Sequence, residues 1–172
     1  MAIACITGCR NRQSAFGVLL LINDVRRHTM ALSDAQADQI AALLNARNEL
    51  TVHYTSQKVL AHSADYLCRL SESNEVLACV EVKKVQWYQA EVLHLTVAAS
   101  QEGQGHAKAL LCEAERLART RGVRLLQCTI RQGNVPSQSL FQGFGFSHVS
   151  TFRNEHSGNN VLVMQKVLAS AV

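Results

Sequence analysis

The sequence has little proline and few aromatic residues, and it lacks repeats and low-complexity runs. Of its 172 residues one is proline and 5% are aromatic, and no long Ser/Gly-rich stretch occurs. These absences exclude a flexible linker and a repeat architecture. Apolar content of 48% with 17% charged residues is enough to bury a full core. We expect one domain over residues 1–172, with residues 1–28 as an N-terminal strand or extension.

A membrane span and a secretory signal are also missing. The apolar run at residues 16–22 follows Arg10 and Arg12 but is too short to cross a bilayer. Asn23 and Asp24 follow it, in place of a small-residue cleavage site. We therefore expect a soluble cytoplasmic protein that does not associate with membranes.

The cysteines lack a metal-ligand spacing. None of the six forms a C-x-x-C pair, and Cys5 and Cys9 have no His or Cys partner at ligand spacing. Cys79, Cys112 and Cys128 fall in apolar periodic segments, where cysteine behaves as a small hydrophobic residue. We expect reduced thiols in the core, no disulfide framework and no metal site.

The net charge of +4 is mild, and much of the excess lies between residues 108 and 131. This excess has two interpretations: a solvated helix face, or a surface that attracts an anionic cofactor or nucleic acid. The segment lacks the interleaved aromatic residues on which bases stack. The solvated face is the favoured interpretation, and nucleic acid stays an open but less favoured partner.

The hydrophobic pattern predicts strands and helices in a mixed order. Ser33, with Gln36 three residues later, forms a capping box that begins a helix. Gly122 ends a second helix and Pro136 lies in the first turn of a third. Strands are expected at residues 66–70, 76–87, 89–97, 125–130, 146–152 and 161–167, with two N-terminal candidates at 2–7 and 15–22. This order favours one α+β domain.

The segment around residues 92–108 has the pattern of a phosphate-binding turn. An apolar strand at 92–97 leads through a short polar turn with Gly103 and Gly105 into a helix. Glycines let the backbone approach a ligand closely, and the first turn of a helix offers unpaired N–H groups. The third glycine of a dinucleotide site is missing, and Lys108 is not followed by the Ser or Thr of a nucleotide triphosphate site.

This segment resembles the acyl-CoA signature of the GCN5-related N-acetyltransferases. That signature is a strand ending in Leu-x-Val, then [QR]-x-x-G-x-[GA] opening a helix that continues to Leu-Leu. Leu95 and Val97 end the strand here, residues 102–107 occupy the six-residue pattern, and Leu110 and Leu111 follow in place. The usual Arg or Gln is replaced by Glu102, which we expect to turn outward because a carboxylate repels a diphosphate.

A second block supports the resemblance. Residues 134–146 are similar to the family pattern N-x-x-[AS]-x-x-L-[YF]-x-x-x-G-F, with matches at Asn134, Ser137, Leu140, Phe141, Gly145 and Phe146. Two motifs at the family's separation are much harder to obtain by chance than one.

The resemblance implies a single-domain, mixed and mostly antiparallel sheet flanked by helices, with acetyl-CoA as cosubstrate. Backbone groups of the strand would bind the pantetheine arm and those of the turn would bind the diphosphate. The implied cofactor-binding residues are Leu95, Thr96, Val97, Gln101, Glu102, Gly103, Gln104, Gly105, His106, Ala107, Lys108, Asn134, Ser137 and Phe141.

The resemblance also proposes catalytic residues. Glu91 is the candidate base, because several members carry a catalytic glutamate four residues before the position of Leu95; an exposed strand-start residue is the alternative. His94 would face away from Glu91 in a regular strand, and a bulge would reverse this. Phe141 replaces the tyrosine that protonates the leaving thiolate in many members, and Tyr54 is the candidate substitute. The polar segment 53–56 is either a surface loop or part of the acceptor pocket.

The sequence thus favours an enzyme that transfers an acetyl group from acetyl-CoA to a primary amine of a small molecule or protein. Glu102 and Phe141 leave open a weak or inactive member that binds CoA or a partner protein. The arginines near the turn leave open an acyltransferase that acts on tRNA or a nucleobase. The sequence does not identify the acceptor. It is compatible with a monomer or a homodimer.

Overall fold

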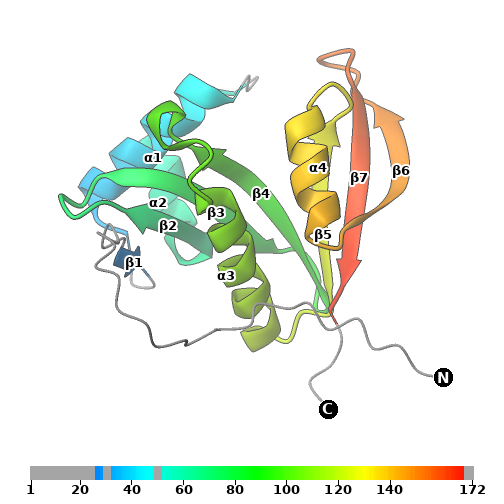
Figure 1. The fold of residues 1–172 in the computed structure, drawn as a ribbon, viewed down its shortest axis with the longest axis horizontal. Coiled ribbons are helices and arrows are strands. Elements are labelled where there is room, and N and C mark those ends of the chain that lie inside the picture. Colours follow the sequence, from blue (N-terminus) through cyan, green and yellow to red (C-terminus); the bar gives the residue numbers. More distant parts are fainter. Residues whose placement is uncertain (1–25, 29–31, 49–51, 169–172) are drawn as a thin grey trace, which may run out of the picture.

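The computed structural model describes residues 26–28, 32–48 and 52–168 and places them in one mixed sheet with helices on both faces (Figure 1). Seven strands run in the order β1-β2-β3-β4-β5-β7-β6. Neighbouring strands are antiparallel except β4 and β5, which are parallel. This arrangement confirms the predicted α+β fold with a mostly antiparallel sheet.

The elements alternate along the chain. The first half contains β1 (Arg26–His28), α1 (Asp34–Arg47), α2 (Ser56–Ala61), the 3-10 helix η1 (Ser63–Asp65), β2 (Tyr66–Leu70), β3 (Val76–Lys84) and β4 (Gln89–Val97). The second half contains the 3-10 helix η2 (Ala99–Gln101), α3 (His106–Thr120), β5 (Leu125–Arg131), α4 (Val135–Gly143), β6 (Ser147–Arg153) and β7 (Asn160–Val167). Among the described residues, no helix combines the length and apolar character that a membrane span requires.

Most predicted elements are confirmed within a few residues. Both hydrogen bonds of the capping box between Ser33 and Gln36 are made, and Pro136 lies in the first turn of α4. The strand predicted at 76–87 ends earlier, because residues 85–88 turn back into β4. The sequence did not predict α2, since six residues are too few for a helical period. The candidate strands at 2–7 and 15–22 lie outside the described residues.

Two hydrophobic clusters lie on opposite faces of the sheet, because neighbouring residues of a strand point to opposite sides. The cluster under α3 contains Val80, Val92, Leu110, Leu111, Cys128 and Phe141. The cluster under α1 and α2 contains Ile40, Leu44, Val59, Cys68 and Cys79. Burial raises the pKa of the Cys68 thiol to about 11 and that of the Cys128 thiol to about 12, so both stay protonated. Of the core thiols that the sequence predicts, Cys79 and Cys128 are buried, whereas Cys112 is only partly buried.

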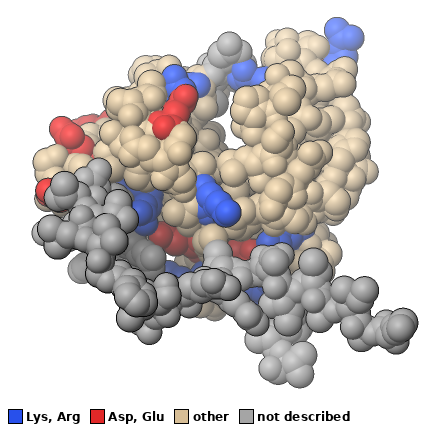
Figure 2. Space-filling view, viewed as in Figure 1, with Lys and Arg blue, Asp and Glu red and all other residues tan. Residues whose placement is uncertain are grey.

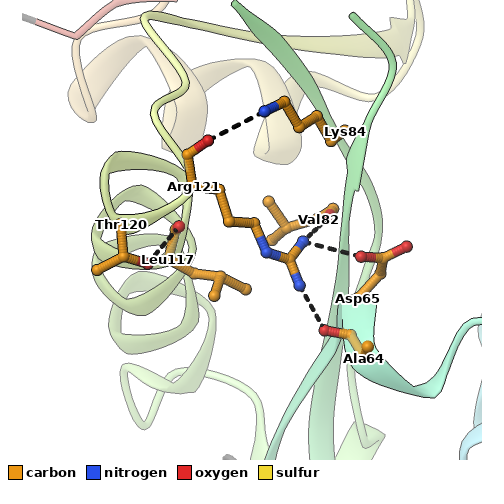
Figure 3. Close-up of polar contacts among 7 residues, drawn as sticks. All are labelled: Ala64, Asp65, Val82, Lys84, Leu117, Thr120 and Arg121. Atoms are coloured by element: carbon orange, nitrogen blue, oxygen red, sulfur yellow. Dashed lines mark hydrogen bonds and ion pairs between the residues drawn. The ribbon is translucent and has the colours of Figure 1, made fainter. Parts of the chain in front are cut away.

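One arginine fixes the C-terminal end of α3 against the strands (Figure 3). Arg121 Nη1 donates to Asp65 Oδ1 at 2.8 Å and to the carbonyl oxygen of Val82 at 2.9 Å, and its Nη2 donates to the carbonyl oxygen of Ala64 at 2.6 Å. Lys84 Nζ donates to the carbonyl oxygen of Arg121 at 3.1 Å. These bonds hold α3, β3 and η1 in one arrangement.

Candidate active site

β4 and β5 pair only at their first residues and then separate. The parallel register runs from Gln89 opposite Leu125 to Glu91 opposite Gln127 and does not continue. On its other side β4 stays paired with β3 up to Val97. The edge of β4 beyond Glu91 therefore faces a cleft of about 700 Å³, a size typical of ligand sites.

The cleft divides the molecule into two halves. Figure 2 shows the notch between the half that carries α3 and the half that carries α4, with basic side chains near its rim. Most of its lining comes from four elements, with Gly133 and Asn159 completing it: Val92, Leu93, His94 and Leu95 of β4; Cys128, Thr129, Ile130 and Arg131 of β5; Asn134, Pro136, Ser137 and Phe141 at α4; and Arg47 and Asn48 at the end of α1.

The N-terminus of α3 is open to a ligand. Gly103 and Gly105 have φ angles of 74° and 83°, which glycine adopts without the steric cost that a Cβ brings. Within the described part of the chain, no side chain caps the first turn of α3. The first-turn N–H groups and the helix dipole therefore suit an anion there.

The predicted cofactor residues lie in three places. Leu95, Asn134, Ser137 and Phe141 line the cleft. Thr96 is buried, its hydroxyl accepts from Asn48 Nδ2 at 2.8 Å, and it is not among the residues that line the cleft. The remaining predicted residues end β4, lead into α3 or form its first turn: Val97, then Gln101, Glu102, Gly103, Gln104 and Gly105, then His106, Ala107 and Lys108.

Side chains of the segment from Glu102 to His106 differ in burial and in hydrogen-bond partners. His106 is buried, and burial lowers the pKa of its imidazole, with the nearby Arg69 charge adding to the effect. Gln104 Nε2 donates to the carbonyl oxygen of Ser100 at 3.3 Å. Glu102 forms an ion pair with Arg47 of α1. The sequence predicted that Glu102 would turn outward; its side chain is more than half exposed and is paired with a cation.

A bulge in β4 changes where His94 points. The register shifts between the Cys79 and Glu81 pairs of β3, and His94 has a φ of 53°, which few residues other than glycine adopt. Glu81 lies directly opposite Leu93, so both project to the face that Glu91 also occupies. His94 reaches the same face, with its Nε2 3.7 Å from Glu81 Oε2. The regular-strand expectation for His94 is therefore wrong, and the bulge is the reason.

Side chains from three segments meet at this bulge. The hydroxyl of Tyr54 is 2.6 Å from His94 Nε2 and the two rings meet edge to face at 4.8 Å. Glu81 is buried behind His94, and Tyr66 hydrogen-bonds to its carboxyl group. Thr96 Oγ1 and Cys79 Sγ donate to the carbonyl oxygen of His94, at 3.1 and 3.9 Å. The bulge is thus fixed by side-chain hydrogen bonds on the α1 and α2 side of the sheet.

Burial sets the protonation of this group. It lowers the pKa of His94 below its ordinary value, so the ring is neutral at pH 7. It also raises the pKa of Tyr54, with the Glu81 charge adding to the effect, so the phenol stays protonated. A neutral imidazole beside a protonated phenol can accept one proton and donate another.

Glu91 is the last residue of β4 that pairs with β5, and it lies between Lys83 of β3 and Gln127 of β5. Burial raises the pKa of its carboxyl group, and Lys83 opposes that rise. Glu91 is not among the residues that line the cleft, whereas His94 is. The structure brings Tyr54 to His94 and leaves Glu91 at the closed end of the separation between β4 and β5.

Phe141 contributes an apolar surface to the α4 side of the cleft. Its ring is buried and meets Phe146 edge to face at a centroid distance of 5.0 Å. Asn134 Oδ1 accepts from the backbone N–H of Ser137 at 3.2 Å and so caps α4. Asn134 therefore stabilises the N-terminus of α4.

Sequence reasoning missed Glu81 and the group of three potential metal ligands that includes it. His62, Asp65 and Glu81 have ligand atoms within 4.8 Å of one another, although Asp65 already pairs with Arg121. A signal for Glu81 was present, since it is the one carboxylate inside the apolar strand 76–82. Its contact with His94 depends on the bulge, which the sequence alone does not reveal.

Comparisons with known proteins agree with this geometry. The family model described as "Acetyltransferase (GNAT) family" matches residues 32–146. No curated protein matches. Among solved structures, Ard1 from Thermoplasma volcanium is 15% identical, with a TM-score of 0.72, over 83% of this chain and 98% of that chain.

Two further structures have the same fold. The ribosomal-protein-S18-alanine N-acetyltransferase from Escherichia coli is 16% identical, with a TM-score of 0.70, over 86% of this chain and 97% of that chain. The yncA protein from Salmonella typhimurium, solved with its cofactor acetyl-CoA, is 18% identical, with a TM-score of 0.72, over 87% of this chain and 96% of that chain. The family model covers more than half of the chain, and the folds agree. The chain therefore belongs to the GNAT family of acetyltransferases, whose cosubstrate is acetyl-CoA.

Proposed function

We propose that this protein transfers the acetyl group of acetyl-CoA to a primary amine of a small molecule or a protein. The observation that carries the proposal is the meeting of two features at one point of β4. A cleft runs along the edge of β4 that β5 leaves unpaired, and α3, which follows β4, begins without a side-chain cap. The Tyr54 and His94 pair lies at the bulge of β4.

The chain's own groups fit the cofactor. The loop from Gln101 to Lys108 would bind the diphosphate through backbone N–H groups. The free edge of β4 at Leu95–Val97 would hydrogen-bond the pantetheine arm, with Ser137 and Phe141 across the cleft. When bound, acetyl-CoA supplies the thioester whose carbonyl carbon the amine attacks.

Transfer forms a C–N bond, breaks the C–S bond and moves two protons. The amine must lose a proton, and the departing thiolate must gain one. In the proposal, the imidazole of His94 accepts the amine proton. The proton reaches the ring directly, or the Tyr54 hydroxyl takes it from the amine while passing its own proton to His94 Nε2. Glu81, 3.7 Å from Nε2, stabilises the imidazolium that results.

Glu91 stays the competing candidate for the base, and Tyr54 the candidate donor to the thiolate. The half-buried position of Glu91 and its raised pKa support the first role. The proximity of His94 to the cleft favours His94 over Glu91. Phe141 has no proton to give, so the donor must come from Tyr54 or from water.

The proposed acceptor is an amine of a small molecule or of a protein. The ribosomal-protein-S18-alanine N-acetyltransferase of Escherichia coli acts, by its name, on a protein, which supports including polypeptide amines among the candidates. The test measures CoA thiol release from acetyl-CoA with a panel of small amines and peptides with free N-termini. Release that depends on an amine supports the proposal.

A second candidate is a CoA-binding protein without activity, and Phe141 is the observation that favours it. This protein would bind CoA in calorimetry but release no thiol with any amine in the panel. Absence of CoA binding by the wild-type chain would overturn both candidates.

A further inference from the structure

Arg47 connects the end of α1 to the loop that precedes α3. It is the last residue of α1, and its guanidinium pairs with Glu102, 55 residues further along the chain. The next residue, Asn48, donates from Nδ2 to Thr96 Oγ1 at 2.8 Å. Two consecutive side chains therefore attach α1 to β4 and to the loop.

This pair has little value as a structural link. The side chains of Arg47 and Glu102 are 39% and 57% exposed, and pairs this exposed contribute little to folding stability because water screens them. Asn48 already fixes the end of α1 through a buried partner. The placement of Arg47 is thus better explained by a ligand.

Glu102 occupies the position where the family motif has Arg or Gln. A carboxylate there would raise the potential energy of a diphosphate bound at the α3 N-terminus. Arg47 cancels that charge, and it also lines the cleft. Its guanidinium has five N–H donors in a planar fork, so a carboxylate on one edge leaves donors for an anion.

We propose that Arg47 is a cofactor-binding residue that donates to the diphosphate of acetyl-CoA and so supplies the cation that position 102 lacks. Glu102 holds the guanidinium at the rim of the cleft before the cofactor arrives. This inference rests on the acetyl-CoA site of the proposed function.

The test measures CoA binding by calorimetry for wild type, Arg47→Ala and Arg47→Gln. We expect both variants to lose roughly five- to thirty-fold in affinity, the range for a charge-assisted hydrogen bond. Arg116→Ala is the matched control, because Arg116 is an exposed arginine of α3 that does not line the cleft. It removes the same charge and should change affinity less than two-fold, by roughly the screened long-range effect. Glu102→Gln should bind CoA at least as tightly as wild type.

Two CoA fragments locate the contact. Dephospho-CoA keeps the diphosphate, so it should show the same loss in Arg47→Ala, whereas pantetheine lacks the diphosphate, the 3′-phosphate and the adenosine and should show none. A loss that disappears with dephospho-CoA would assign Arg47 to the 3′-phosphate and overturn the inference.

Other outcomes separate the inference from the proposed function. If wild type binds CoA and Arg47→Ala binds as Arg116→Ala does, only the inference fails. If wild type does not bind CoA, the proposed function fails with it. Thermal melts without ligand check that each variant folds. If Arg47→Ala does not fold, Arg47→Gln, which keeps most of the side-chain stem, is used for the comparison instead.

Discussion

At the scale of single residues, the site depends on an unfavourable backbone conformation. His94 has a φ of 53°, which costs a residue with a Cβ about 1–2 kcal/mol. Hydrogen bonds from Thr96 and Cys79 to its carbonyl oxygen, and a hydrogen bond between the Tyr54 hydroxyl and its ring, hold it there. Strain of this kind gathers at functional sites because the surrounding structure fixes it.

A matched pair of substitutions tests this strain. His94→Ala and His94→Gly both remove the imidazole, but glycine adopts a positive φ without a steric cost. We expect His94→Gly to be more stable than His94→Ala by about 1 kcal/mol in urea unfolding, although both lose activity. Equal stability of the two variants would show that the bulge relaxes in solution.

The base has a defined pH signature. Burial lowers the pKa of His94 in the folded state, and only the neutral ring accepts a proton. The kcat/KM of the wild type should therefore rise with pH and level off below the ordinary His value. His94→Gln should lower kcat by about 10² to 10⁴ and abolish that acid limb. If Glu91→Gln has this effect instead, Glu91 is the base.

At the scale of elements, one helix serves both cofactor binding and stability. The N-terminus of α3, at Gly105, has no side-chain cap, while its C-terminal end is bonded to β3 and η1 through Arg121 (Figure 3). The Arg121 contacts that hold α3 in place are thus at its C-terminal end, and none of them uses the N–H groups of its first turn.

Loss of this fixation should reduce stability. Arg121→Ala removes three hydrogen bonds and leaves the carbonyl oxygens of Val82 and Ala64 without this donor, so the free energy of unfolding should fall by about 1–3 kcal/mol. Urea titration measures the change, with Arg124→Ala as control because Arg124 is exposed. Activity below the melting temperature should be retained; a loss of kcat without a loss of stability would give Arg121 a catalytic role.

At the scale of the whole molecule, the cleft lies between two halves that share one sheet. β4 belongs to one half and β5 and α4 to the other (Figure 1). A ligand that contacts both sides binds the folded state alone and stabilises it by mass action.

Thermal shift tests this linkage. Acetyl-CoA at 100 times its Kd should stabilise wild type by about 2.7 kcal/mol and raise Tm, while an unrelated nucleotide should not. Gly105→Glu should abolish the shift, because its φ of 83° disfavours a side chain and the carboxylate repels the diphosphate. A shift that survives in a folded Gly105→Glu protein would place the cofactor elsewhere.

The cofactor motif, its position after β4 and most elements could be predicted from the sequence, because they depend on residues close together in the chain. The strand, the two glycines of the turn and the capped helices are all local patterns. The family match over residues 32–146 confirms the resemblance that these motifs carry. Residues 2–7 and 15–22 could not be tested, since they lie outside the described residues.

The amino-acid sequence by itself determined the fold class, the family and the cosubstrate. Only the tertiary structure decided which side chains meet. Tyr54 and His94 are 40 residues apart and Arg47 and Glu102 are 55 residues apart, so no local pattern pairs them. The bulge at His94 turns one side chain to the other face, and such a break in register comes from packing between strands rather than from the residue types along one of them.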